Sequence, residues 1–313
     1  MKRFKNILVV INDEKKHEGT INRAVQLAIN NRATLTFASV MENIPHELQI
    51  YVKSKMSKDL HEAVFQEHLS RLEDFLEPIR EKGVQASAKV LIGKPFMEII
   101  MEVLRNGRDL VMVPQERGIG LSESIFGSTS LHLLRKCPCP VWIIKREQRR
   151  NFARILVALD PRIYPDGKYD SSKDELSIKL LEIGSSLAHS EGGEIYIFHA
   201  WSVLYENHIR FQSGLSQEEI EMLFLNTKKE HEKRILELVA KHAPEVDKNC
   251  IHMRRGEAGR LIPEIARHDN IELIIMGTVG RAGILGLLIG NTAEMILNNV
   301  DCSVLAVKPD GFV

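Results

Sequence analysis

Continuous apolar runs alternate along this chain with segments whose apolar residues recur every three or four positions. In the first half, the apolar runs lie near residues 6–11, 33–40, 86–92, 108–113 and 140–145. Runs of this kind are typical of strands buried on both faces. The other segments predict amphipathic helices, with one stripe at Leu60, Val64, His68, Leu72, Phe75 and Ile79 and another at Ile220, Leu223, Ile235, Leu238 and Val239. This alternation predicts right-handed βαβ units and a parallel sheet with helices on both faces.

The pattern occurs twice. CPVWIIK at 139–145 and CSVLAVK at 302–308 are 163 positions apart, and the same spacing relates Gly127 to Gly290 and Gly93 to Gly256. Residues 7–11 match 155–159 at a spacing of only 148, and Leu35 matches Ile195 at 160. The second copy therefore carries an insertion of 12 residues after its first strand.

The insertion falls in the stretch Pro161 to Asp174, whose Pro, Gly, Asp and Ser content predicts a loop long enough to cover a site. A chain of 313 residues exceeds the size at which one hydrophobic core usually stops growing. We therefore expect two tandem doubly wound domains, 1–148 and 149–313, each built on a five-stranded parallel sheet.

Charge and apolar content exclude several classes of function. Lys plus Arg and Asp plus Glu both total 42, so no net field steers the chain toward nucleic acid or an anionic membrane. No stretch approaches the roughly 20 apolar residues that span a bilayer, and the first apolar run ends at Asn12, too early for a signal peptide. Four cysteines fit a reducing compartment, so a cytoplasmic location is expected. Cys137 and Cys139 are interpreted as small apolar residues leading into a strand, with redox or metal chemistry as the alternative.

Glycines gather after the fourth strand of the second copy. Gly277, Gly280 and Gly290 have the spacing G-x2-G-x9-G and precede a predicted helix at 293–299. Glycine lets the backbone approach phosphate oxygens closely, and the amides at a helix N-terminus favour an anion. Ligands of doubly wound sheets bind beyond the carboxyl ends of the strands, where strand order reverses. The spacing therefore predicts a phosphate cradle in the second copy.

These residues resemble the universal stress protein family, whose nucleotide-binding members carry G-x2-G-x9-G-[ST] and an aspartate at the end of the first strand. Gly277, Gly280, Gly290 and Asp160 match that pattern. Asn291 departs from the usual Ser or Thr, and Thr292 follows it with a hydroxyl. The segments LLRKCPCPVWIIK and MGTVGR…GNTAE look most like the tandem E-type members.

The resemblance implies the adenine nucleotide α-hydrolase-like fold, with ATP or another adenine nucleotide as ligand of the second domain. The implied site is Asp160, Gly277, Gly280, Arg281, Gly290, Asn291 and Thr292, and no metal site is proposed. In the first copy the matching positions are Asn12, Pro114 and Arg117, and only Gly127 with Ser128 remains. Proline lacks an amide hydrogen, so nucleotide binding is not expected there.

Other roles compete for some of these residues. Arg281 either pairs with a phosphate or is a solvated loop residue. Asn291 and Glu294 have the spacing of a capping box, which is a structural role at a helix start that needs no ligand. His199 touches the base or is a satisfied histidine at a strand end. His61 and His68 lie about 10.5 Å apart along one helix, too far for one ion.

The resemblance implies a non-enzymatic cytoplasmic protein that resists stress, including DNA damage, with its two domains packed as a pseudo-dimer through their fifth strands. The resemblance is also compatible with a further homodimer of the whole chain, whereas direct binding of nucleic acid or of membranes is not expected. No catalytic residue is assigned, because no G-x-S-x-G, HExxH or kinase motif set occurs. Two alternatives remain: a slow ATPase or nucleotide-modifying enzyme, and a nucleotide-free module that binds an apolar ligand or a protein through the helices at 54–82 and 216–243.

Overall fold

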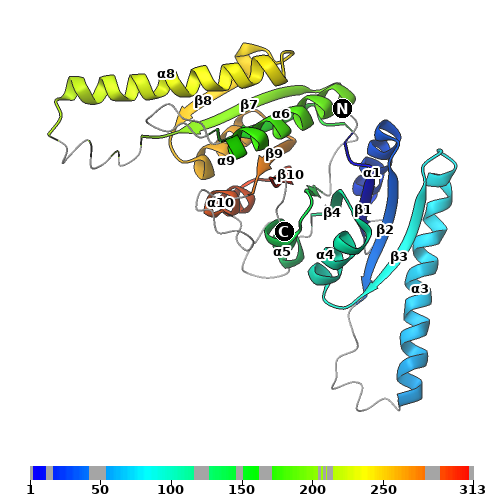
Figure 1. Cartoon of the computed structure of the whole chain (residues 1–313). Coiled ribbons are helices and arrows are strands. Elements are labelled where there is room, and N and C mark those ends of the chain that lie inside the picture. Colours follow the sequence, from blue (N-terminus) through cyan, green and yellow to red (C-terminus); the bar gives the residue numbers. More distant parts are fainter. Residues whose placement is uncertain are drawn as a thin grey trace. The chain divides into compact units, whose positions relative to one another are not determined.

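The computed structural model describes residues 3–11, 17–41, 54–115, 127–145, 151–161, 171–203, 206, 209, 214–278 and 290–309, with backbone alone at 54–61 and 171–173. The chain divides into two compact units, one covering Lys2–Arg150 and the other Asn151–Ile284 and Leu288–Phe312. Each unit alternates strands with helices (Figure 1). The expected pairing of the two fifth strands stays a prediction.

The first unit follows the predicted order. Its elements are β1 (Asn6–Val10), α1 (Glu18–Asn31), β2 (Thr34–Met41), α3 (Ser54–Arg80), β3 (Ala86–Ile92), α4 (Pro95–Asn106), β4 (Leu110–Pro114), α5 (Ser128–Lys136) and β5 (Val141–Ile144). All five strands predicted from apolar runs are present to within two residues. The strand order is β3-β2-β1-β4-β5, and the pairings between neighbours are parallel.

The second unit repeats this plan. Its elements are β6 (Arg154–Leu159), α6 (Ser171–Glu191), β7 (Glu194–Trp201), α8 (Gln217–His242), the short 3-10 helix η1 (Lys248–Cys250), β8 (Ile251–Arg255), α9 (Ala258–His268), β9 (Leu273–Gly277), α10 (Asn291–Asn299) and β10 (Ser303–Val307). The strand order is β10-β9-β6-β7-β8, again with parallel pairings. The secondary structure shows the same spacing as the sequence, since α5 and α10 begin 163 positions apart.

Helices cover both faces of each sheet, which confirms the doubly wound architecture. In the second unit α6 packs on β6 and against α8, while α9 packs on β7 and against α10. In the first unit α1 packs on β1, α3 on β2 and β3, and α4 against α5. The central strands are buried on both faces: Ile7, Leu8, Val9, Ile155, Leu156 and Val157 have no exposed surface. Unbroken apolar runs result because neither face of such a strand meets water.

The loop predicted at Pro161 to Asp174 is partly wrong, because α6 already begins at Ser171 and includes Asp174; residues 162–170 lie outside the described part of the chain. Cys137 and Cys139 are buried, with their Sγ atoms 3.6 Å apart, at the turn that leads into β5. Among the described residues, none of the helices has the length and hydrophobicity that a membrane-spanning helix requires.

Candidate functional site

The strand order of the second unit reverses between β6 and β9. From β6 the chain winds outward through β7 and β8, then crosses back to β9 on the other side of β6 and continues to β10. The carboxyl ends of β6 and β9 therefore flank the switch point, where helices on opposite faces leave a crevice. Leu159, the last residue of β6, and Gly277, the last residue of β9, both lie at this edge.

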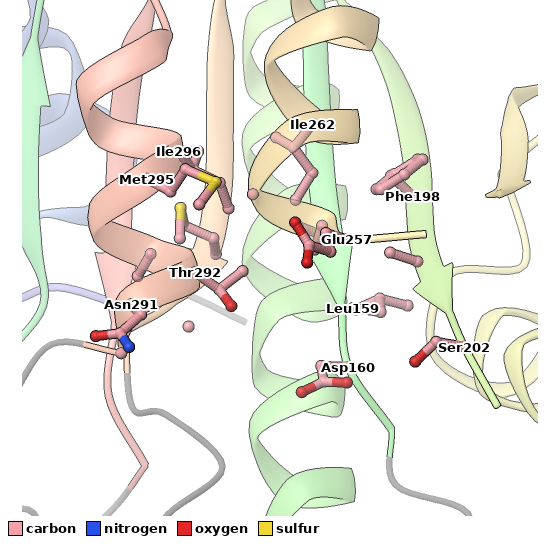
Figure 2. Close-up of a pocket in the computed structure, with 18 of the residues that line it drawn as sticks. Leu159, Asp160, Phe198, Ser202, Glu257, Ile262, Asn291, Thr292, Met295 and Ile296 are labelled. Atoms are coloured by element: carbon pink, nitrogen blue, oxygen red, sulfur yellow. The ribbon is translucent and has the colours of Figure 1, made fainter. Parts of the chain in front are cut away.

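A cavity of about 960 Å³ occupies this crevice. Its walls are largely apolar and come from β6, α6, β7, α9, β9 and α10, with Leu159, Leu176, Phe198, Ile262, Met276 and Ile296 among the lining side chains. That volume lies within the range of small-molecule sites, which are mostly apolar and carry a few polar groups that orient the ligand. Figure 2 shows Phe198 and Ile262 facing this space from β7 and α9.

Most of the residues predicted for the site meet at this cavity. Asp160 directly follows β6, Gly277 ends β9, and Gly290, Asn291 and Thr292 lie at the start of α10, and all five line the cavity. In Figure 2, Asp160 and Thr292 come from different elements and border the same space. Gly280 and Arg281, predicted to complete the set, lie outside the described residues.

Gly277 is glycine for a steric reason. A Cβ at this position would lie 2.8 Å from Cδ2 of Leu176, which itself lines the cavity. A side chain at position 277 would therefore push Leu176 or occupy part of the cavity. The ends of the glycine-rich segment are also joined, because the Gly290 amide donates to the Thr278 carbonyl at 3.1 Å. The segment from 278 to 290 thus leaves and returns at one point beside β9.

The start of α10 differs from the capping box that the sequence suggested. Gly290 is the N-cap, with φ −63° and ψ 144°, and no side chain caps the helix there. Asn291 is the first helical residue, so the capping box suggested for Asn291 and Glu294 is wrong. The N-terminal amides of α10 consequently lack a side-chain cap and begin at the cavity, where an anion would complement them.

Sequence reasoning missed five polar residues of this cavity: Ser177, Ser202, Glu206, Glu257 and Thr278. Thr278 is 2% exposed, and its hydroxyl has no hydrogen-bond partner among the described residues. Glu257 directly follows Gly256, at the position that Lys94 holds in the first copy. The signal for Glu257 was adjacency to a repeated glycine, Gly256, and that for Thr278 was adjacency to Gly277 of the spaced glycine pattern. All charged side chains in the described lining, Asp160, Glu206 and Glu257, are carboxylates.

His199 is a satisfied internal histidine. It is 1% exposed, and its Nδ1 lies 2.9 Å from the Leu159 carbonyl, while its Nε2 lies 2.8 Å from Nδ1 of His231 on α8. The Leu159 carbonyl can only accept, so Nδ1 of His199 is the donor in that hydrogen bond. Its neighbours in β7, Phe198 and Ala200, line the cavity, and side chains alternate along a strand. The side chain of His199 therefore points toward α8 and away from the cavity. The interpretation that His199 contacts a base is wrong.

The first copy keeps the glycine N-cap of the site but not the glycine at the strand end. Gly127 caps α5 as Gly290 caps α10, with φ −54° and ψ 160°. Pro114 ends β4 where Gly277 ends β9. Asn12 and Arg117 lie outside the described residues. At the matched strand end the first copy therefore offers a proline ring and no amide hydrogen.

The chain therefore has two tandem doubly wound domains, and in the second of them glycines line a cavity at the switch point. This architecture places it in the class of α/β proteins with a nucleotide-binding type of fold. The family model described as Universal stress protein family matches this chain twice, over residues 3–145 and 151–308. The chain belongs to the universal stress protein family and contains two copies of its domain.

Curated relatives match over nearly the full chain. The Universal stress protein E homolog of Haemophilus influenzae is 26% identical over 328 residues, covering 98% of both chains. Universal stress protein E of Escherichia coli K12 is 25% identical over 329 residues, covering 100% of this chain and 96% of the relative. Among solved structures, a protein of unknown function from Pseudomonas aeruginosa PAO1 is 22% identical, covers 99% of this chain and 95% of its own, and has a TM-score of 0.76. This last likeness supports the fold.

Proposed function

We propose that this chain is a non-enzymatic stress-response protein, similar to universal stress protein E, whose second domain, 149–313, binds an adenine nucleotide. One observation carries the proposal: Asp160, Gly277 and Gly290, widely separated in sequence, line one cavity at the switch point of the second sheet. In this proposal the first domain, 1–148, has a structural or other role. Cytoplasmic action against stress, including DNA damage, is the family expectation that accompanies it.

The chemistry of the cavity supports a nucleotide more than a purely apolar ligand. The apolar walls suit a base, and the Asp160 carboxylate accepts hydrogen bonds from ribose hydroxyls. The uncapped amides of α10 favour a phosphate group. Because the charged side chains of the described lining are acidic, backbone amides, rather than cationic side chains, supply the attraction for phosphate in this part of the site.

Calorimetric titration of the full chain with ATP, ADP, AMP and GTP tests the proposal. We expect binding of adenine nucleotides with one site per chain, and thermal stabilisation that reaches about 2.7 kcal/mol when the ligand is at 100 times its dissociation constant. Absence of both signals for every adenine nucleotide would refute nucleotide binding.

Three substitutions locate the site. Gly277→Val should abolish binding by filling the cavity next to Leu176, while Pro114→Val, at the matching position of the first copy, should leave binding unchanged. Asp160→Asn keeps the shape of the side chain and should weaken binding. Loss of binding in Pro114→Val instead would place the site in the first domain.

Phosphate release by the purified chain distinguishes the enzymatic alternative. We expect no release above the rate of a Gly277→Val control. A rate that requires ATP and disappears in Asp160→Asn would overturn the non-enzymatic assignment while leaving nucleotide binding in place.

A further inference from the structure

Helix α4 of the first domain carries a solvent-exposed apolar stripe. Met97, Met101 and Leu104 are 48%, 38% and 55% exposed, and their spacing of four and three residues places them on one face of the helix. Ile92, the last residue of β3 just before α4, is 44% exposed. Among the described residues, no other segment of similar length carries as many exposed large hydrophobic side chains as these four positions. The opposite face of α4 packs into the domain through Ile99, Glu102 and Val103.

The fold itself does not require this stripe, because the second copy lacks it. Helix α9 is the counterpart of α4, 163 positions further on, and its residues Arg260, Glu264 and Arg267 stand where α4 has Met97, Met101 and Leu104. All three are exposed. The same helix in the same position is therefore charged in one domain and apolar in the other. Contiguous exposed apolar surface of this kind marks an interaction site.

The charges beside the stripe identify its partner. Glu98 and Arg105 are seven residues apart, so they lie on the same flank of α4. When two identical helices pack antiparallel, residues on the same flank face each other across the contact. Such a pair of α4 helices, centred near Met101, places Glu98 of each chain opposite Arg105 of the other. In a parallel arrangement the two charged flanks would lie on opposite sides of the contact, and Glu98 would not face Arg105 of the other chain. The flank is thus self-complementary.

We propose that α4 is a homodimer interface, through which two copies of this chain associate antiparallel about a two-fold axis near Met101. A two-fold contact uses the same patch on both chains, as this stripe and its charges require. Methionine suits the role because its unbranched side chain adapts to a facing copy. A helix of 12 residues is about 18 Å long and presents less surface than a standard interface. The dimer is therefore concentration-dependent.

Sedimentation or light-scattering mass measurements on the full chain without nucleotide, at about 1 to 200 μM, test this interface separately from the proposed function. The mass should rise with concentration from that of one chain, 35.6 kDa, toward twice that value. Met101→Glu should raise the dissociation constant about tenfold or more, because it places two carboxylates at the centre of the contact. The matched substitution Arg260→Glu on α9 should leave the mass unchanged.

A charge swap gives a second, independent readout. Glu98→Arg and Arg105→Glu should each weaken association, and the double variant should restore it because the flank becomes self-complementary again with the signs exchanged. Circular dichroism melting confirms that each variant is folded. A wild-type chain that stays single over this range, a dimer unaffected by Met101→Glu, or a double variant no better than the single ones would each overturn the proposal.

Discussion

The guanidinium of Arg108 donates a hydrogen bond of 2.6 Å to the carboxylate of Glu102 on the buried face of α4. Lys89 of β3 donates to the other carboxylate oxygen, also at 2.6 Å, and Arg108 further donates to Asn6. Glu102 is 2% exposed. In the second domain the positions of Glu102 and Arg108 are held by Ile265 and Ile271, both buried. The duplicated fold thus accepts either a buried ion cluster or hydrocarbon at this site.

Glu102→Gln should destabilise the first domain by about 3 kcal/mol, because it leaves Arg108 largely buried without its counter-charge. The double variant Glu102→Ile with Arg108→Ile, which copies the second domain, should lose far less, since replacing a whole buried pair by apolar residues is often neutral. Urea unfolding at pH 7 measures both. Equal losses in the two variants would show that the charges stabilise the domain as a pair.

The same cluster predicts acid sensitivity. Burial raises the pKa of Glu102, but hydrogen bonds and charge attraction from Lys89 and Arg108 outweigh it, so the pKa lies below its ordinary value. A carboxyl whose pKa is lower in the folded state stabilises above its unfolded pKa and loses that contribution as pH falls through the folded pKa. The stability difference between wild type and Glu102→Gln should therefore shrink when unfolding is measured at pH 3 to 4 instead of pH 7. A constant difference would contradict the shift.

Two matched helix ends predict a stabilising substitution. Arg32 follows α1 with φ 53°, and Gly192 follows α6 at the equivalent position with φ 67°. A side chain in this left-handed region costs about 1 kcal/mol, which glycine avoids. Arg32→Gly should raise the free energy of unfolding by roughly 1 kcal/mol, and Gly192→Arg should lower it by a similar amount. Thermal melts of both variants provide the comparison.

A close contact between helix and sheet makes Gly184 of α6 intolerant of a side chain. A Cβ at Gly184 would lie 2.4 Å from Cγ2 of Val157 in β6 and 3.0 Å from Cδ1 of Ile195 in β7. Gly184→Ala should therefore destabilise the domain by about 1 to 2 kcal/mol despite the better helix propensity of alanine. Ala24 holds this position in α1 with its side chain fully buried, so Ala24→Gly should also destabilise. Stabilisation by Gly184→Ala would show that α6 can move away from the sheet at little cost.

The hydroxyl of Thr278 in the cavity lining gives a test of ligand contact. Its buried hydroxyl lacks a partner among the described residues, so Thr278→Val should leave the free protein equally stable or stabilise it by up to about 1 kcal/mol. If the hydroxyl contacts the nucleotide, the same variant should bind ATP about fivefold more weakly, which is a loss of about 1 kcal/mol. Melting of the free protein and calorimetric titration separate the two effects. Unchanged affinity would assign the hydroxyl no role in binding.

Local sequence reasoning failed where the outcome depended on packing between distant elements. The capping box at Asn291 has suitable spacing, but the helix begins one residue earlier than that interpretation requires, with Gly290 as its N-cap. His199 was open to two interpretations until α8 was seen to bring His231 within 2.8 Å. The importance of Thr278 and Glu257 was not visible in the sequence because neither belongs to the spaced glycine pattern, although Thr278 follows Gly277 and Glu257 follows the repeated Gly256.

The sequence by itself determined the duplication, the doubly wound fold and the switch point where Asp160, Gly277 and Gly290 meet, because unbroken apolar runs, helical periodicity and a constant spacing of 163 are local or self-comparing signals. Only the tertiary structure decided which side chains face the cavity, that Glu102 is held in an ion cluster, and that Met97, Met101 and Leu104 remain exposed. The apolar residues of α4 look the same in sequence whether they are buried or exposed. Their environment depends on which face of the helix the sheet covers, and that is set by the packing of the whole domain.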